Sequence, residues 1–284
     1  MARNTVGKSG VTPCKHFLLD RLLGQEAGVY GTGRLPICDS AVWVDLTAGD
    51  GQPTRVEKPE NSCSAGIFTK HASFVVERKK PLEVCLFEIN KITHDKLKSN
   101  LRNKWFDKYP NARSVVTAVN QDSSKIYLNV SRSTACFLYN DPNSIDDWAF
   151  TEKFLESTPP FTRTLTTMGC NVGGLKRVLS DSPERSDVWR KNIEMLFMLQ
   201  RHELILFAVG DASQWAYLIS TPDSWLEDTV DLCKKAHSLQ THTKRAPRIV
   251  TTKKPREFDA LLDELLMTKE QLLQKNLIQP ELFS

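Results

Sequence analysis

Alternating apolar runs and amphipathic segments constrain the fold of this 284-residue chain more than any other feature. Short apolar runs suit buried strands, and the longer segments between them carry apolar residues at helical spacing. Strands that alternate with helices form a mostly parallel sheet, whereas two runs joined by a short loop form a hairpin. We therefore predict an α/β fold, a mostly parallel sheet flanked by helices with an antiparallel terminal hairpin, built from the runs at 41–46, 83–88, 114–119, 134–139, 161–171, 204–209 and 215–219.

The expected helices divide the chain into three parts. Residues 1–36 form an N-terminal helical segment, whose helix is expected to end near Gly24, and residues 37–236 form the main domain. Residues 237–284 form a basic linker and a C-terminal helix. Apolar spacing predicts the further helices from about Ser64 and at 91–110, 185–200, 223–236 and 257–277.

The composition, with 40% hydrophobic and 25% charged residues, is typical of a globular protein. No apolar run approaches the roughly 18 residues of a membrane span. The N-terminus has no apolar stretch of the kind that directs secretion, so we expect a cytoplasmic protein. The seven cysteines and six histidines show neither C-x-x-C nor H-x-x-x-H spacing, which predicts no disulfide framework and no metal site. Cys85 and Cys136 are expected in the core.

Positive charge is concentrated near the C-terminus, although the net charge of the chain is only +4. The segment 234–256 contains Lys and Arg residues but no acidic residue. Such a segment can bind the phosphates of a nucleic acid, or it can be a solvated linker.

Acidic residues and glycines follow the predicted parallel strands. The first run ends at Asp45, in the stretch AVWVDLTAGDGQ, and the second ends at Glu88. Ligands of such sheets bind beyond the carboxyl ends of the strands, and a carboxylate there can accept hydrogen bonds from both hydroxyls of a ribose. A nucleoside-containing ligand is implied. The chain contains neither the G-x-G-x-x-G of dinucleotide sites nor the phosphate-binding G-x-x-x-x-G-K-[ST].

The stretches VDLTAGDG, LFEIN and FLYNDPN, followed by the hairpin, resemble motifs of class I S-adenosylmethionine-dependent methyltransferases over roughly residues 41–220. This resemblance implies a Rossmann-like methyltransferase sheet with S-adenosylmethionine as the cofactor. It implies that Glu88, at the end of the second predicted strand, binds the ribose, and that Asp122, after the third predicted strand, lies near the adenine. The positions that it implies for cofactor binding are Asp45, Thr47, Gly49, Gly51, Glu88 and Asp122.

A second resemblance rests on the order of DLTAGDG, SAGIFTKHA, FEIN and LYNDPN. This order is similar to that in the three-Cys-motif partner proteins of bacterial mobile elements. It implies a catalytically silent, methyltransferase-like partner protein in a mobile-element or defence system.

The dipeptide Asp141-Pro142 resembles the start of the [DN]-P-P-[YFW] motif of amino-methyltransferases that act on bases. Asp141 is the candidate base or acceptor-orienting group, and Asn143 is its hydrogen-bonding neighbour. The aromatic position of the motif is absent, so Tyr139 or Trp148 would have to stack on a base in its place. The same dipeptide also suits a turn at the end of a strand.

A second glycine-rich loop, GCNVGGLKR, supplies Asn171, Lys176 and Arg177 as candidate substrate-binding residues. The loop is equally suited to be the entry to a helix, with solvated basic ends. The sequence thus predicts methyl transfer from S-adenosylmethionine, with a nucleic acid as the favoured acceptor. A small-molecule or protein acceptor stays open, as does the silent partner protein.

Overall fold

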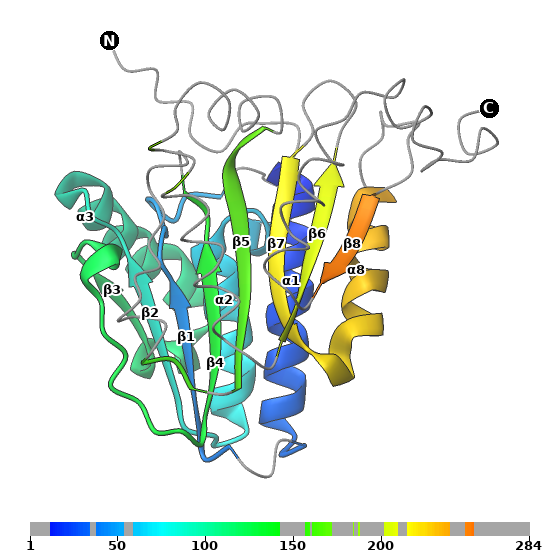
Figure 1. Ribbon diagram of the computed structural model, residues 1–284. Coiled ribbons are helices and arrows are strands. Elements are labelled where there is room, and N and C mark those ends of the chain that lie inside the picture. Colours follow the sequence, from blue (N-terminus) through cyan, green and yellow to red (C-terminus); the bar gives the residue numbers. More distant parts are fainter. Residues whose placement is uncertain are drawn as a thin grey trace, which may run out of the picture.

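The computed structural model describes residues 12–34, 38–53, 59–142, 157–159, 161–171, 184, 187, 202–209, 215–238 and 248–252. Its centre is an eight-stranded sheet in the order β3-β2-β1-β4-β5-β7-β6-β8 (Figure 1). The strands are β1 (Ser40–Asp45), β2 (Leu82–Phe87), β3 (Val116–Val119), β4 (Thr134–Asn140), β5 (Phe161–Asn171), β6 (His202–Val209), β7 (Trp215–Pro222) and β8 (Arg248–Thr252).

The register confirms the predicted sheet. Strands β1 to β5 pair in parallel, and β7 is antiparallel to both β5 and β6. The carboxyl ends of the parallel strands therefore meet at one edge, which is the upper edge in Figure 1. The predicted Rossmann-like fold class, with its antiparallel terminal hairpin, is confirmed in this part of the chain.

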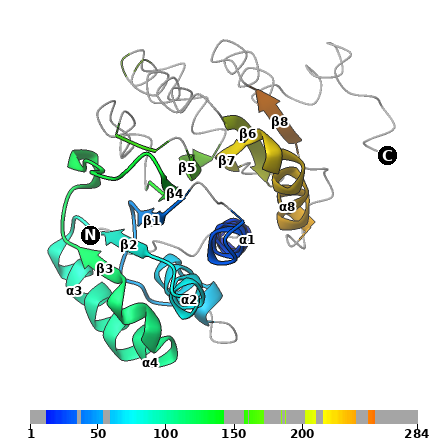
Figure 2. The ribbon, with the colours of Figure 1, turned by 90° about the horizontal axis from the view of Figure 1, so that it is seen from below.

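Helices α1 (Thr12–Gly31), α2 (Ser64–Glu77), α3 (Lys91–Asn100) and α8 (Leu226–Ser238) lie on the same side of the sheet (Figure 2). Helix α2 begins where Cys63 Sγ accepts a hydrogen bond from the Gly66 amide, which supplies a partner for one of the first amides of the helix. The α3 helix continues through a π-helical turn (Leu101–Trp105) into the short α4 (Phe106–Lys108). None of the described helices has the length and apolarity that crossing a membrane requires.

The core lies between this helical layer and the sheet. The Phe68 ring of α2 packs edge-on against Phe137 and at a tilt against Tyr139, with centroids 6.3 and 6.5 Å apart, and all three side chains are buried. Cys136 is also buried, as predicted, whereas Cys85 on β2 is only partly buried.

The predicted end of the first helix near Gly24 is wrong, because α1 continues to Gly31. A Cβ atom at Gly24 would lie 3.0 Å from His71 Cε1, so the glycine allows α1 to approach α2 closely rather than ending the helix. His71 Nε2 of α2 lies 2.8 Å from Asp20 Oδ1 across this contact.

The predicted linker also needs correction, since its residues Arg248–Thr252 form β8 and pair with β6. The terminal parts thus contribute to the main domain, because α1 lies in its core and β8 extends its sheet. The predicted helices at 185–200 and 257–277 lie outside the described residues, apart from Asp187 alone.

Candidate functional site

The carboxyl end of β1 presents a buried carboxyl group. Asp45 is fully buried, and its Oδ1 accepts a hydrogen bond from the Thr47 amide at 2.9 Å. Its Oδ2 is buried and makes no hydrogen bond in the described part of the chain. Burial raises the pKa of Asp45 from 3.8 to about 7, although Ser64 and the Thr47 amide lower this pKa and so offset part of the rise. A buried acceptor without a partner is suited to receive a hydrogen bond from a ligand.

The glycine loop that follows β1 is held from one side and open on the other. Gly49 and Gly51 have positive φ angles of 62° and 67°, which glycine adopts without strain. Gly51 lies against the helical layer: its carbonyl accepts a hydrogen bond from Trp105 Nε1 at 3.0 Å, and Asn100 Nδ2 donates to the Asp50 carbonyl at 2.8 Å. In the described part of the chain a Cβ atom at Gly49 would have nothing within 4 Å, so no described residue covers the backbone there.

Glu88 follows β2, the neighbour of β1 in the sheet. It is partly buried, and its Oε1 accepts a hydrogen bond from the Asn90 amide at 2.7 Å. Asn120, at the end of β3, donates from Nδ2 to the carbonyls of Glu88 and Ile89 at 2.8 and 3.1 Å. These contacts fix the turn that carries Glu88 beside the glycine loop. Asn120 was not among the predicted residues, although its position at a strand end could have indicated it.

Asp122 lies near the end of β3, but its carboxylate serves its own turn. Oδ1 accepts from the amide and the hydroxyl of Ser124 at 3.0 and 2.7 Å, and Oδ2 lies 3.5 Å from Lys125 Nζ. The hydrogen bonds from Ser124, followed by the charge of Lys125, lower the pKa of Asp122. The contacts of the carboxylate are therefore those of a helix cap.

Asp141, at the end of β4, is held by three other segments. Lys15 of α1 forms an ion pair with its Oδ2, and Thr167 of β5 donates to its Oδ1 at 2.7 Å. Its backbone amide donates to Thr47 Oγ1 at 2.8 Å, which joins it to the glycine loop. Sequence reasoning missed Lys15 and Thr167, since no local pattern connects residues 126 and 26 positions away from Asp141.

The Lys15–Asp141 pair is expected to contribute to stability, because both side chains are mostly buried, at 15% and 26% exposure. In a double-mutant cycle of Lys15→Met and Asp141→Asn, measured by urea unfolding, we expect a coupling energy of about 1–2 kcal/mol. Additive losses would show that the pair contributes nothing. The exposed Lys91–Asp95 pair on α3 is the control, with an expected coupling of about 0.3–0.5 kcal/mol.

One candidate, Tyr139, lies away from this site, and the structure does not describe the side chains of the other remaining candidates. Tyr139 is 1% exposed and packs in the core, so it cannot stack on a base. Asn171 ends β5, but its side chain is not among those described, and Trp148, Asn143, Lys176 and Arg177 lie outside the described residues. The cofactor candidates Asp45, Thr47, Gly49, Gly51 and Glu88, together with Asp141, occupy one edge of the sheet.

No protein-family model and no curated protein sequence matches this chain. Among solved structures, it is similar to an O-methyltransferase from Bacillus cereus in complex with SAH, at 14% identity and a TM-score of 0.40, covering 74% of this chain and 80% of that one. It is also similar to a putative rRNA-methylase from Clostridium thermocellum, at 13% identity and a TM-score of 0.39, covering 70% of this chain and 94% of that one. Such low identities and TM-scores assign neither a family nor an activity, so the fold assignment rests on the strand order and register of this chain.

Proposed function

We propose that the chain binds S-adenosylmethionine at the carboxyl edge of its sheet and transfers the methyl group to an acceptor, most favourably a nucleic acid. The observation that carries the proposal is the meeting of three features on adjacent strands. These are the unpaired, buried Oδ2 of Asp45, the open backbone at Gly49 and the Glu88 carboxylate. Together they offer hydrogen-bond acceptors and accessible backbone to a nucleoside-containing ligand.

The residues present fit this cofactor. Glu88 would accept hydrogen bonds from the ribose hydroxyls, and the loop from Thr47 to Gly51 would hold the methionine and ribose portion beside Asp45. When bound, the cofactor supplies an electrophilic methyl group on a sulfonium. The protein then has to hold the acceptor in line with that group. Asp141 is fixed in place by Lys15 and Thr167, and can orient an acceptor amine or hydroxyl by accepting a hydrogen bond from it.

The nucleic acid acceptor is supported by charge. Lys234 and Lys235 are exposed on α8, and Arg248 begins the edge strand β8. Lys234 also lies 3.1 Å from Asp231, so its charge is shared with a neighbour. If these residues hold a phosphate backbone, the affinity for single-stranded or duplex oligonucleotides falls steeply as salt is raised. Affinity that does not change with salt would exclude this part of the proposal.

Replacing Glu88 with Ala is expected to weaken S-adenosylhomocysteine binding at least about tenfold, since hydrogen bonds to a charged group contribute about 1.5–3 kcal/mol. Isothermal titration calorimetry measures the loss directly. Glu83→Ala is the matched control, because Glu83 is an exposed residue on β2, the strand that Glu88 follows. Equal affinities of the wild type and the Glu88 variant would remove Glu88 from the site.

A catalytically silent partner protein is the second candidate. The observation that favours it is that both carboxylate oxygens of Asp141 already have partners within the chain, as a purely structural turn would require. Titration of the folded wild type separates the two candidates. Micromolar binding of S-adenosylmethionine supports the enzyme, and the absence of binding supports the silent partner.

A further inference from the structure

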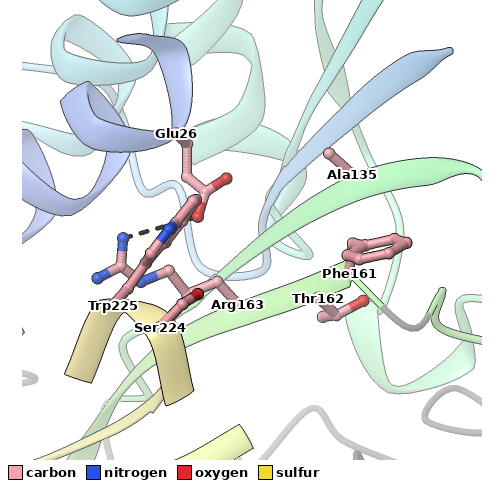
Figure 3. Close-up of a pocket in the computed structure, with 7 residues that line it drawn as sticks. All are labelled: Glu26, Ala135, Phe161, Thr162, Arg163, Ser224 and Trp225. Atoms are coloured by element: carbon pink, nitrogen blue, oxygen red, sulfur yellow. Dashed lines mark ion pairs between the residues drawn. The ribbon is translucent and has the colours of Figure 1, made fainter. Parts of the chain in front are cut away.

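Charged side chains outside the candidate site include a buried pair at the amino edge of the sheet. Figure 3 shows Glu26 of α1 and the Trp225 ring on one side of a cavity of about 110 Å³, and Phe161 and Ala135 on the other. Arg163 of β5 pairs with Glu26 at 3.6 Å between Nη1 and Oε1, the ion pair dashed in the figure. Both side chains are buried and they are opposite in charge, so the pair balances its own charge inside the fold and joins α1 to β5.

Exposed positive charge, by contrast, is concentrated on the outer helices. Residues 91–113 form α3, the π-helical turn, α4 and most of the 3₁₀ turn before β3, and contain seven Lys or Arg residues and two Asp residues. Their net charge of +5, with His neutral, exceeds the +4 of the whole chain. All seven basic side chains are exposed. The helices lie at one end of the helical layer, beside the edge strand β3 (Figure 2), so the charge lies on an outer surface.

Most of this charge has no acidic partner among the described residues. Three of the seven side chains form ion pairs, namely Lys91 with Asp95, Lys108 with Glu60 and Arg113 with Asp107. The other four are Lys96, Lys98, Arg102 and Lys104. Lys98 and Arg102 are four residues apart, a spacing at which like charges on a helix repel each other. These seven side chains, the α3–α4 surface, therefore leave positive charge for an anionic partner to neutralise.

The buried face of the same helices holds the glycine loop of the candidate site. Trp105 Nε1 donates to the Gly51 carbonyl at 3.0 Å. Lys104 Nζ donates to Oε1 of Gln52, the next residue of the chain, at 2.6 Å. One member of the α3–α4 surface thus contacts the segment that follows the loop. A polyanion bound to this surface lies beside the candidate site.

The α3–α4 surface fits a nucleic acid better than a membrane. Residues 91–108 run for about 27 Å at 1.5 Å per residue, which matches about eight base pairs of duplex at 3.4 Å each. A helix that lies in a membrane interface needs a broad apolar face. Leu97, Leu101 and Trp105 are buried in the core, and Ile92 is the one exposed large hydrophobic side chain among residues 91–108. The exposed face therefore offers cations along its length and too little apolar surface to enter a bilayer.

We propose that the α3–α4 surface binds the phosphate backbone of a nucleic acid, with Lys96, Lys98 and Arg102 as phosphate contacts. The identification of this nucleic acid as the methyl acceptor rests on the proposed function, whereas its binding to the surface does not. Contacts of this kind set the position of a strand and are independent of base sequence. They hold an acceptor beside the glycine loop. DNA and RNA share the phosphodiester backbone, so both are probes in the test.

The test follows binding of the full chain to fluorescein-labelled DNA and RNA strands of one sequence, about 20 nucleotides long, by fluorescence anisotropy. In the triple variant Lys96→Gln, Lys98→Gln and Arg102→Gln we expect binding at least about tenfold weaker. The slope of log K against log salt is expected to fall in magnitude by about 2, because three phosphate contacts are lost at about 0.7 each on a single strand.

A second triple variant, Lys79→Gln, Lys80→Gln and Arg132→Gln, removes the same charge before β2 and β4, at the amino edge of the sheet, and is the matched control. Its affinity is expected to change by about twofold at most, since salt at about 0.1 M screens exposed charges over about 10 Å. Both variants are expected to bind S-adenosylhomocysteine as the wild type does, because Lys104 and Trp105, which hold the loop, are unchanged. Urea unfolding checks that both variants are folded.

A loss confined to the first variant, with either polymer, supports the proposal, and the polymer that binds more tightly gives the class of partner. Equal losses in the two variants, or unchanged affinity of the first, overturn it. A wild type that binds neither DNA nor RNA, or that binds phosphatidylserine vesicles alone, also overturns it. If the wild type binds a nucleic acid through this surface but does not bind S-adenosylhomocysteine, the proposed function fails and the surface assignment stands.

Discussion

Asp45→Asn is expected to make the ligand-free protein more stable at about pH 8 while it weakens S-adenosylhomocysteine binding. The folded protein raises the pKa of Asp45 from 3.8 to about 7, chiefly by burial, so its ionised form is disfavoured in the fold. A shift of about 3 units corresponds to up to about 4 kcal/mol of unfolding free energy. The variant carries no charge at this position and avoids this loss.

The sign of the pH dependence follows from the proton count. Between about pH 4 and 7 the folded state keeps the Asp45 proton that the unfolded chain has released, so the free energy of unfolding falls as pH rises. Urea unfolding of the wild type and the variant across this range measures the effect, because their difference isolates Asp45 from other titrating groups. The two proteins should be equally stable below about pH 4 and diverge above it. If the free energies of unfolding of the two proteins differ by the same amount at every pH, the fold does not raise the pKa of Asp45.

Asp122→Asn is the control of opposite sign. Ser124 and Lys125 lower the pKa of Asp122, so its contribution to stability is present above the usual pKa and is lost as the pH falls through the lowered value. Its replacement is expected to destabilise the protein at neutral pH, whereas that of Asp45 stabilises it.

Gly51→Ala is expected to lower the free energy of unfolding by about 2–4 kcal/mol. Its φ of 67° disfavours any side chain, and its Cβ would lie 2.8 Å from Leu97 Cδ1 and 3.3 Å from the Ala65 Cβ. Both neighbours are fully buried and have little room to move. The loop would have to shift away from the helical layer, which would also displace the Trp105 hydrogen bond to the Gly51 carbonyl.

Gly49→Ala separates backbone strain from the steric clash. Gly49 has a similar φ of 62°, but among the described residues a Cβ there would meet nothing within 4 Å. The expected loss is only the left-handed backbone term of about 1–2 kcal/mol. Equal losses for the two variants in urea unfolding would mean that Leu97 and Ala65 accommodate the methyl group at Gly51.

The fold was predictable because its information is local. Most of the parallel strands are apolar runs bounded by turn residues, with the Thr-rich β5 as an exception, and the alternation of strands with helices restricts how they can connect. The position of the candidate site was predictable for the same reason, since Asp45 ends β1, the loop with Gly49 and Gly51 comes next, and Glu88 follows the neighbouring strand β2. Strand β8 was missed because it is a short edge strand of five residues that begins with Arg248 and lies within a basic segment, which reads as a linker.

The sequence by itself determined the order of strands β1 to β7 and of the described helices, and the residue types at the ends of the parallel strands. Only the tertiary structure decided that Lys15 neutralises Asp141, that Gly24 allows close helix packing, and that Arg163 shares a cavity wall with Glu26. The physical reason is that these contacts join segments far apart in the chain. Local propensity and periodicity describe what each segment forms, whereas such contacts depend on how the packed core brings those segments together.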